Sequence, residues 1–329
     1  MAQEFRVGVA GLIHGHVWGL IGSWEKVEGA QLVAVADATP LLDRAKESFA
    51  RSYADWREML ESETLDALVV TSDNVESSEI AVAALKQGIP CLVEKAMAAN
   101  AKDADRMLAA AEESGKLLMI NWPLAWSPAV YELKKLIDAE TVGPVFHMRY
   151  RNGHHGPKEI GCDPYFVGWL YDESRSGGGA IADFGCYGAV LARWYFGMPD
   201  SVFAYRGNFT KDYDVSDDFA VILLKYPKST VVLEATWATR GEDGSGNPVV
   251  LGRDGTLAVH GSTIRQSGIS TAEHEAPGLP ISSPAEYFLA CLRNGTEPDG
   301  ILNSKIAADA CRILDAAIES TRTGAAVKP

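Results

Sequence analysis

Short β-branched runs alternate with longer amphipathic segments through the first third of the chain, and this alternation limits the folds available to it. The runs that predict strands are residues 6–10, 31–36, 67–71, 90–94 and 117–120. The segments that predict helices are residues 17–27, 40–51, 77–87, 103–114 and 131–137. Strands and helices that alternate at this spacing are typical of a parallel sheet with right-handed crossovers. We therefore expect residues 1–121 to form an α/β domain on a doubly wound parallel sheet.

The pattern changes after Pro144, where most of the predicted strands follow one another without a helix between them. These strands are residues 145–151, 201–208, 218–226, 230–239 and 256–261. The helices predicted in this part of the chain are residues 180–196, 284–292 and 303–321. Successive strands joined by turns predict an antiparallel or mixed sheet. Residues 122–329 should therefore form an α+β domain built on a predominantly antiparallel open sheet.

Composition and charge exclude several classes of protein. With 329 residues, 47% of them hydrophobic and 22% charged, the chain is not disordered and is long enough for two domains. A net charge of −14 without a Lys/Arg block argues against nucleic-acid and anionic membrane partners, because both need clustered positive charge. No apolar run is long enough to cross a bilayer. The five cysteines are widely spaced without a CxxC pair, so we expect reduced thiols in a cytoplasmic protein.

Glycines gather where the first predicted strand ends. Gly8, Gly11 and Gly15 would permit a tight turn in which backbone N–H groups approach a phosphate, and the next helix would direct its positive end to the same place. The spacing departs from GxGxxG, because Ile13 stands where a glycine is often found. A purely structural turn between strand and helix is the alternative interpretation.

Asp37 follows the second predicted strand, 31–36. An acidic residue at this position can accept both ribose hydroxyls of NAD, and it would repel the 2′-phosphate of NADP. Neither Ala38 nor Thr39 supplies an arginine for that phosphate, so the sequence favours NAD. The alternative is an aspartate that caps the following helix.

Lys95 directly follows the predicted strand 90–94. Doubly wound sheets bind their ligands beyond the carboxyl ends of the strands, so this lysine is a candidate proton acceptor or hydrogen-bond donor. An ordinary surface charge is the alternative.

In the predicted helix 180–196, Asp183 and Tyr187 are four residues apart and would share one face. A carboxylate and a phenol on one face can bind a polyol and pass a proton. Taken alone, however, the segment favours the alternative of an aspartate stabilised by the helix dipole and a tyrosine packed in the core.

These features occur in an order that resembles the Gfo/Idh/MocA oxidoreductase family. The order comprises the glycine turn, Asp37, the strand that ends at Thr71 with Asn74 after it, Glu94–Lys95, and the segment from Gly177 to Tyr187. The resemblance implies an N-terminal Rossmann domain and a second domain that binds substrate and forms a homodimer or homotetramer through its open sheet. It also implies hydride transfer between NAD or NADP and a sugar, an inositol or a related polyol.

The resemblance assigns roles to individual residues. It implies catalytic roles for Lys95, Asp183 and Tyr187. The residues expected to bind the cofactor are Gly8, Gly11, Ile13, His14, Gly15, His16, Asp37, Thr71, Ser72, Asn74, Glu94 and Lys95. Two departures indicate a divergent branch. Ala96 replaces the family's proline, which removes an easy route to a cis peptide after the lysine, and Tyr187 replaces the more frequent histidine.

Other residues are candidates for substrate or metal. His154 and His155 follow the first strand of the second domain and could contact substrate or act as the base, with ordinary surface histidines as the alternative. The ring of Trp122 could stack on a sugar, with core packing as the alternative. We expect them to bind substrate together with Asp183. The pair His14-x-His16 suggests zinc, but the later ligands that zinc would need are not evident, so we expect no metal.

Two other functions fit the same residues. One is an NAD-binding protein without dehydrogenase activity, such as a sensor or scaffold. The other is an NAD-dependent glycoside hydrolase or lyase that oxidises its substrate transiently and re-reduces it. Coenzyme binding without turnover would indicate the first, and product release without net NADH would indicate the second.

Overall fold

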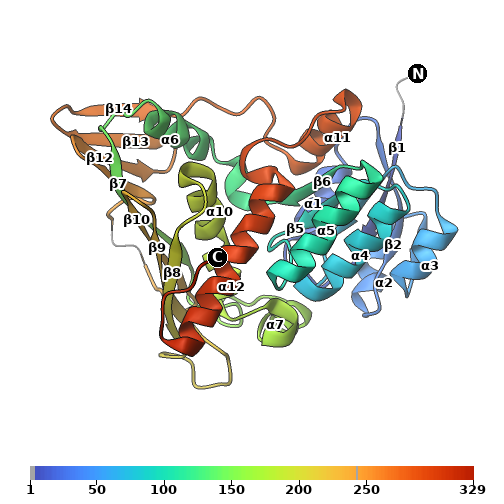
Figure 1. Ribbon diagram of the computed structural model, residues 1–329. Coiled ribbons are helices and arrows are strands. Elements are labelled where there is room, and N and C mark those ends of the chain that lie inside the picture. The colour runs from blue at the N-terminus through green and yellow to red at the C-terminus, as the bar shows by residue number, and fades with distance from the viewer. Residues whose placement is uncertain (1–3, 242–243) are drawn as a thin grey trace. The chain divides into compact units, whose positions relative to one another are not determined.

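The computed structural model describes residues 4–241 and 244–329, which divide into two compact units (Figure 1). The first unit contains residues 4–121, 161–177 and 281–308. The second unit contains the remaining described residues, up to position 329. The first change of unit falls between Asn121 and Trp122, and two later segments of the chain return to the first unit.

A six-stranded parallel sheet forms the centre of the first unit. Its strands are β1 (Phe5–Ala10), β2 (Ala30–Ala36), β3 (Arg51–Tyr53), β4 (Ala67–Val70), β5 (Cys91–Glu94) and β6 (Leu118–Asn121). Their order is β3-β2-β1-β4-β5-β6, and every neighbouring pair is parallel. Every residue of β4, β5 and β6 is buried, as in strands that are covered on both faces. The prediction of a doubly wound parallel sheet is confirmed.

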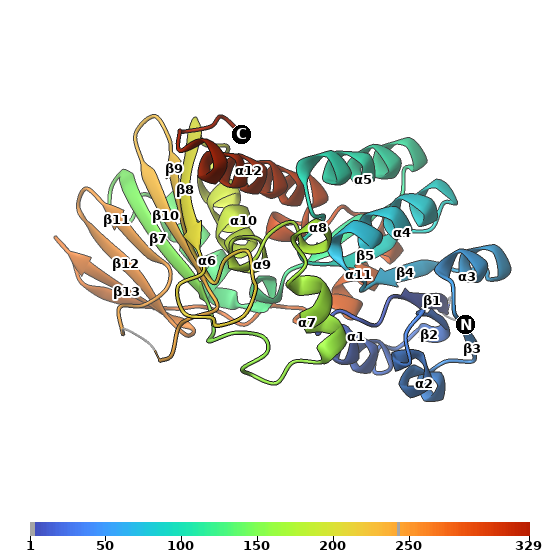
Figure 2. The same ribbon diagram turned by 90° about the horizontal axis from the view of Figure 1, so that it is seen from below.

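Helices cover both faces of this sheet. The helices of the first unit are α1 (Val17–Trp24), α2 (Leu41–Ala45), α3 (Trp56–Ser62), α4 (Asn74–Lys86), α5 (Ala101–Ser114), α7 (Pro164–Leu170), α8 (Glu173–Ser176) and α11 (Pro284–Asn294). Short 3₁₀ turns occur at Lys46–Ser48 and Gly300–Leu302. Figure 2 shows α4 and α5 side by side on the face opposite α1. On its own side, α1 packs against α11 through the rings of Trp24 and Phe288, whose centroids are 6.3 Å apart.

An eight-stranded mixed sheet forms the second unit. Its strands are β7 (Val145–Gly153), β8 (Ser201–Gly207), β9 (Phe219–Lys225), β10 (Thr230–Thr236), β11 (Val249–Gly252), β12 (Gly255–His260), β13 (Thr263–Gly268) and β14 (Ala272–Glu275). Their order is β14-β13-β12-β11-β7-β10-β9-β8. Only the pair β7–β10 is parallel among these described strands. The predicted α+β unit on a predominantly antiparallel sheet is therefore confirmed.

One face of this sheet carries the helices and the other does not. The helices are α6 (Pro128–Asp138), α9 (Ala180–Asp183), α10 (Gly185–Phe196) and the later part of α12 (Ser304–Thr323), with a 3₁₀ turn at Pro123–Trp126. Alternate side chains of β10, such as Val231 and Leu233, are buried beneath α10. Figure 2 shows no helix over the opposite face in the part of the chain that is described. Within that part, no helix combines the length and apolar composition that a bilayer span requires.

The structure differs from the sequence prediction at several elements. The predicted helix 180–196 is two helices, because α9 ends at Asp183 and α10 begins at Gly185. Gly185 and Gly188 are poor helix formers, and both pack closely against side chains beneath α10, such as Ile222 and Leu233. The short strand β3 and the strands β11, β13 and β14 were not predicted, since they are brief or carry many polar residues.

Candidate active site

The β1–α1 turn lies directly against the turn after β4. Gly11 has φ +85°, and a Cβ there would lie 2.6 Å from the backbone nitrogen of Ser72, so only glycine fits. The turns are joined by two hydrogen bonds: Thr71 Oγ1 donates to the Gly11 carbonyl at 2.5 Å, and His14 N–H donates to the Thr71 carbonyl at 3.1 Å. At Gly15, by contrast, a Cβ would make only an ordinary contact.

Asp37 is buried at the end of β2, where its carboxylate holds the glycine turn. One oxygen accepts the N–H of Leu12 at 2.6 Å, and the other accepts the N–H of Thr39 at 2.7 Å. Helix α2 begins after Pro40 without a side-chain cap, so Asp37 does not serve as that cap. A carboxylate oxygen accepts up to two hydrogen bonds, and Thr39 supplies two to Oδ1 through its N–H and its hydroxyl. Oδ2, which accepts the N–H of Leu12, has room for one ribose hydroxyl.

A cavity of about 340 Å³ opens beside Asp37 within the first unit. Gly11 and Ile13 line one side, while Trp56 and Arg57 line another. The Arg57 guanidinium lies 4.0 Å above the Trp56 ring. Neither residue was predicted from the sequence, because β3 and α3, which bring them here, have no clear periodic signal.

The residues that follow β4, among them the predicted Ser72 and Asn74, make structural contacts, and so does Gly8 of β1. Asp73 caps α4 by accepting the N–H groups of Val75 and Glu76, and it pairs with Arg175 at 2.7 Å. Asn74 Nδ2 donates to the Ser176 carbonyl at 2.8 Å, which ties α4 to α8. Ser72 hydrogen-bonds Glu76. Gly8 packs inside β1, where a Cβ would lie 2.7 Å from a methyl carbon of Leu65.

His14, His16 and Glu94 form a cluster at the ends of β1 and β5. His16 Nδ1 lies 3.0 Å from Glu94 Oε2, and Asn121 Nδ2 donates to the other carboxylate oxygen. Burial alone would raise the pKa of Glu94, but the hydrogen bond and charge of His16 outweigh it and hold that pKa below its usual value. Burial, together with the nearby charges of His16 and Lys95, lowers the pKa of His14 to about 3.

Lys95 follows Glu94 and is buried. The Lys95–Ala96 peptide bond is cis, although Ala96 lacks the easy route to a cis bond that the family's proline provides. The Lys95 carbonyl faces His14 Nε2 at 3.1 Å, and its N–H donates to Glu94 at 3.2 Å. The predicted cofactor residues on β1 and β5 therefore lie together in the first unit.

Asp183 and Tyr187 lie on consecutive helices of the second unit and are both buried. Trp237 Nε1 donates to the Asp183 carboxylate at 3.0 Å. Tyr187 belongs to an aromatic group in which its ring stacks on Phe184 at 6.1 Å and meets Trp122 edge-on at 5.9 Å. Trp122 is thus packed against the predicted catalytic tyrosine and is itself buried.

The two loop histidines have different surroundings. His154 meets the Phe184 ring edge-on at 4.9 Å, so it belongs to the same aromatic group as Tyr187. Its Nδ1 accepts the N–H of Gly156 at 3.0 Å. His155, by contrast, contributes its backbone carbonyl to a hydrogen bond from Lys211.

Two buried aspartates that the sequence did not indicate hold the surroundings of Asp183. Asp217 accepts the N–H groups of Gly179 at 3.1 Å and Ile181 at 2.8 Å, and burial raises its pKa. The backbone carbonyl of Asp218 accepts the N–H of Trp237 at 2.7 Å. The pair could not be predicted, because nothing in the sequence distinguishes Asp217 and Asp218 from two acidic residues of an exposed loop.

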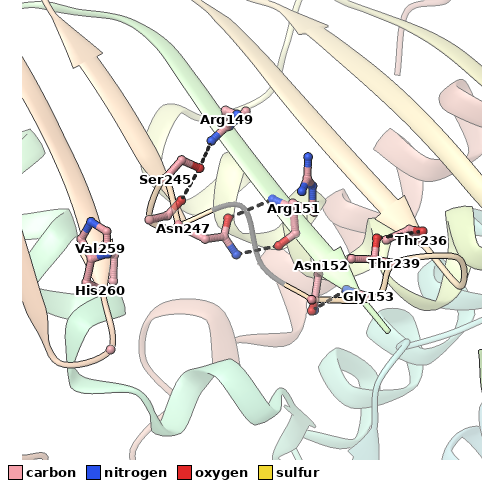
Figure 3. A pocket seen from close by; sticks show the side chains of 14 residues that line it. Arg149, Arg151, Asn152, Gly153, Thr236, Thr239, Ser245, Asn247, Val259 and His260 are labelled. Carbon is pink, nitrogen blue, oxygen red and sulfur yellow. Dashed lines mark hydrogen bonds between the residues drawn. The ribbon is translucent and has the colours of Figure 1, made fainter. Parts of the chain in front are cut away.

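A second cavity of about 340 Å³ lies on the second unit, between β7, β12 and the segment after β10 (Figure 3). Arg149 reaches Ser245 across it, and Asn247 pairs with the main chain of Arg151 through both of its amide atoms. His260 lines the opposite side. None of the residues predicted for substrate or cofactor lies in this lining.

A parallel sheet with a glycine turn and a buried acid after β2 is the arrangement of a dinucleotide-binding domain. The chain belongs to the Gfo/Idh/MocA family. The family model described as "Oxidoreductase family, NAD-binding Rossmann fold" matches residues 5–122. The model described as "GFO/IDH/MocA C-terminal domain" matches residues 130–263. The resemblance predicted from the sequence is confirmed.

Relatives of known activity and structure agree with this assignment. The D-apiose dehydrogenase of Paraburkholderia graminis is 26% identical, covering 84% of this chain and 77% of its own. The D-xylose 1-dehydrogenase (NADP(+)) 2 of Haloferax volcanii is 25% identical, covering 84% of each chain. The WlbA dehydrogenase of Bordetella pertussis, solved with NADH and UDP-GlcNAcA, has a TM-score of 0.83 at 21% identity, covering 100% of this chain and 99% of its own.

Proposed function

We propose that this protein is an NAD(P)-dependent dehydrogenase that acts on a CH–OH group of a sugar, an inositol or a related polyol. The observation that carries the proposal is the glycine turn of the first unit, where Gly11 and Asp37 border one cavity. Family membership and relatives named for D-apiose and D-xylose support the same conclusion.

The residues around the cavity fit a dinucleotide. Gly11 lets the β1–α1 turn pack directly on Ser72, as a tight dinucleotide-binding turn requires, and one oxygen of Asp37 retains acceptor capacity for a ribose hydroxyl. We propose NAD as the preferred cofactor because of that carboxylate. When bound, the nicotinamide supplies a hydride acceptor or donor. Glu94 and Lys95, at the end of β5, would lie toward the nicotinamide half, since β1 and β4 separate them from Asp37 in the sheet.

We propose that Lys95 and Tyr187 transfer the proton of the substrate hydroxyl and that Asp183 orients the substrate. The hydrogen bond from Trp237 supports the role of Asp183, because it fixes the direction of the carboxylate. His154 shares the aromatic group of Tyr187, which supports its proposed contact with substrate. Trp122 and His155 complete the proposed substrate set.

The open face of the second sheet supports the proposal of a homodimer or homotetramer. Tyr205 is 70% exposed on β8, and Leu223 is 43% exposed on β9. Both point away from the helix-covered face, since their strand neighbours Ala204 and Ile222 are buried.

The proposed cytoplasmic location is supported by the five cysteines, none of which forms a disulfide.

A panel of polyols and aldoses tests the proposed activity. We expect NAD⁺ to be reduced in the presence of at least one sugar or inositol. Coenzyme binding without turnover of any member would contradict the proposal in favour of a sensor or scaffold. Glycoside cleavage without net NADH would contradict it in favour of a hydrolase or lyase.

A further inference from the structure

Three potential metal ligands converge at the strand ends of the first unit. The β1–α1 turn contributes His14 and His16, and β5 ends with Glu94. One ring nitrogen of each histidine and one Glu94 oxygen all lie within 4.8 Å of one another. The sequence showed the two histidines but not the third donor, because Glu94 is 78 residues away from His16 along the chain.

The hydrogen bonds of His14 determine which of its nitrogens carries the proton. Nε2 lies 3.1 Å from the carbonyl oxygen of Lys95, which can only accept, so Nε2 must donate. Nδ1 accepts the N–H of His16 at 3.2 Å, so a cation bound to Nδ1 would replace this hydrogen bond. A neutral histidine that donates its second ring N–H to a backbone carbonyl is the usual arrangement of a metal-bound histidine.

Glu94 is held in a comparable way. Its Oε1 accepts a hydrogen bond from Asn121 Nδ2, while Oε2 faces His16. Metal-ligating carboxylates are commonly oriented by such outer partners. The carboxylate is buried, and its Oε2 is the oxygen that faces the histidine side.

We propose that His14, His16 and Glu94 bind one divalent cation of the zinc type. Two nitrogens and one oxygen are donors that Zn²⁺ accepts readily, whereas Mg²⁺ prefers oxygen ligands alone. Three protein ligands leave a further coordination position for water or for an oxygen of a bound ligand. The side chain of His16 is 39% exposed, which provides a path for the cation.

This site is separate from the cavity beside Asp37. Asp37 follows β2 and Glu94 follows β5, with β1 and β4 between them in the sheet. The cavity lining includes Gly11 and Ile13 but none of the three donors. The inference goes beyond the proposed dehydrogenase activity, and it can be tested without measuring turnover.

Calorimetry on the full-length protein, treated with EDTA and then dialysed, tests the proposal. We expect one Zn²⁺ to bind per chain and Mg²⁺ to give no comparable heat. His16→Gln and Glu94→Gln should each weaken Zn²⁺ binding by more than the roughly 10–100-fold that loss of an outer-shell partner costs. His147→Gln, which removes a histidine of β7 in the second unit, should leave the affinity unchanged.

Cobalt provides a second readout, because Co²⁺ absorbs visible light according to its ligands. Addition of Co²⁺ should produce an absorption band that Zn²⁺ abolishes by competition and that is lost in both variants. Absence of Zn²⁺ binding by the unmodified protein would overturn the proposal. So would equal Zn²⁺ affinity in the unmodified protein, His16→Gln and Glu94→Gln, with circular dichroism showing that each is folded.

Discussion

Single residues determine which ligands the first unit can take. Asp37 was predicted from its position after an apolar strand, and the structure places it at the end of β2 beside the glycine turn. The His16–Glu94 contact could not be predicted, because it depends on the pairing of distant strands. The same holds for Arg57, which reaches the cavity of Asp37 only through β3 and α3.

Replacement of Asp37 should change the choice of cofactor. In Asp37→Ala we expect a lower kcat/KM with NAD⁺ and a higher ratio of NADP⁺ to NAD⁺ efficiency. The carboxylate that repels a 2′-phosphate would be gone, while Arg57 would remain in the same cavity. Steady-state kinetics with both coenzymes measures the ratio, and Asp43→Ala, an exposed acid on α2, is the control. A ratio that stays at the unmodified value would remove Asp37 from ribose recognition.

Lys95 should affect turnover more than coenzyme binding. Loss of a group that transfers protons typically reduces the rate by roughly 10²–10⁴-fold, so we expect Lys95→Ala to lower kcat by that range. The Kd for NAD⁺, measured by calorimetry, should change little. Lys86→Ala, at the exposed end of α4, serves as the control. An unchanged kcat in Lys95→Ala would show that another group handles the proton.

At the scale of elements, the order of strands and helices in the first unit followed from their alternation along the sequence. Local pattern could not show that the helix predicted at 180–196 is interrupted. The start of α9 likewise depends on Asp217, which lies beyond β8 and accepts the N–H groups of Gly179 and Ile181. The geometry around Asp183 depends on contacts between distant segments. The hydrophobic periodicity of a sequence carries no information about such contacts.

The loop after β7 is fixed by Glu159, and this contact should depend on pH. Burial would raise the pKa of Glu159, but hydrogen bonds from Lys211 and Tyr213 lower it to about 2. A pKa below the unfolded value of 4.5 means that the contact stabilises the fold above pH 4.5. That stabilisation is lost as the pH falls toward 2.

Glu159→Gln should therefore lower Tm at pH 7, and the difference from the unmodified protein should shrink at pH 3. Thermal melts at both pH values measure the two differences. Asp214→Asn, an exposed acid in the β8–β9 loop, should show no such narrowing. If the Tm difference for Glu159→Gln were the same at both pH values, the ionised carboxylate would not be the stabilising group.

For the whole molecule, the sequence predicted two domains and the first boundary close to Asn121. The return of residues 161–177 and 281–308 to the first unit could not be predicted, because only packing assigns such segments to one core or another. The exposed face of the second sheet was expected only through the family resemblance. From the sequence alone, the apolar residues of this exposed face cannot be told apart from those of a sheet that is buried on both faces.

A charge on that face should prevent assembly. Leu223→Glu would place a carboxylate on the open face of β9, and its burial between two copies would be costly. Light scattering after size exclusion should give an oligomer for the unmodified protein and a monomer for Leu223→Glu. Ile160→Glu, an exposed apolar residue in the loop after β7, should remain oligomeric. An oligomer of unchanged mass in Leu223→Glu would place the interface elsewhere.

We propose above all that the first unit binds a pyridine dinucleotide across the ends of β1, β2 and β4. Calorimetric titration of the protein with NAD⁺, NADH, NADP⁺ and NADPH would detect this binding. We predict one site per chain, with tighter binding of the NAD forms and weaker NAD binding in Asp37→Ala. No heat of binding with any of the four coenzymes would contradict the claim.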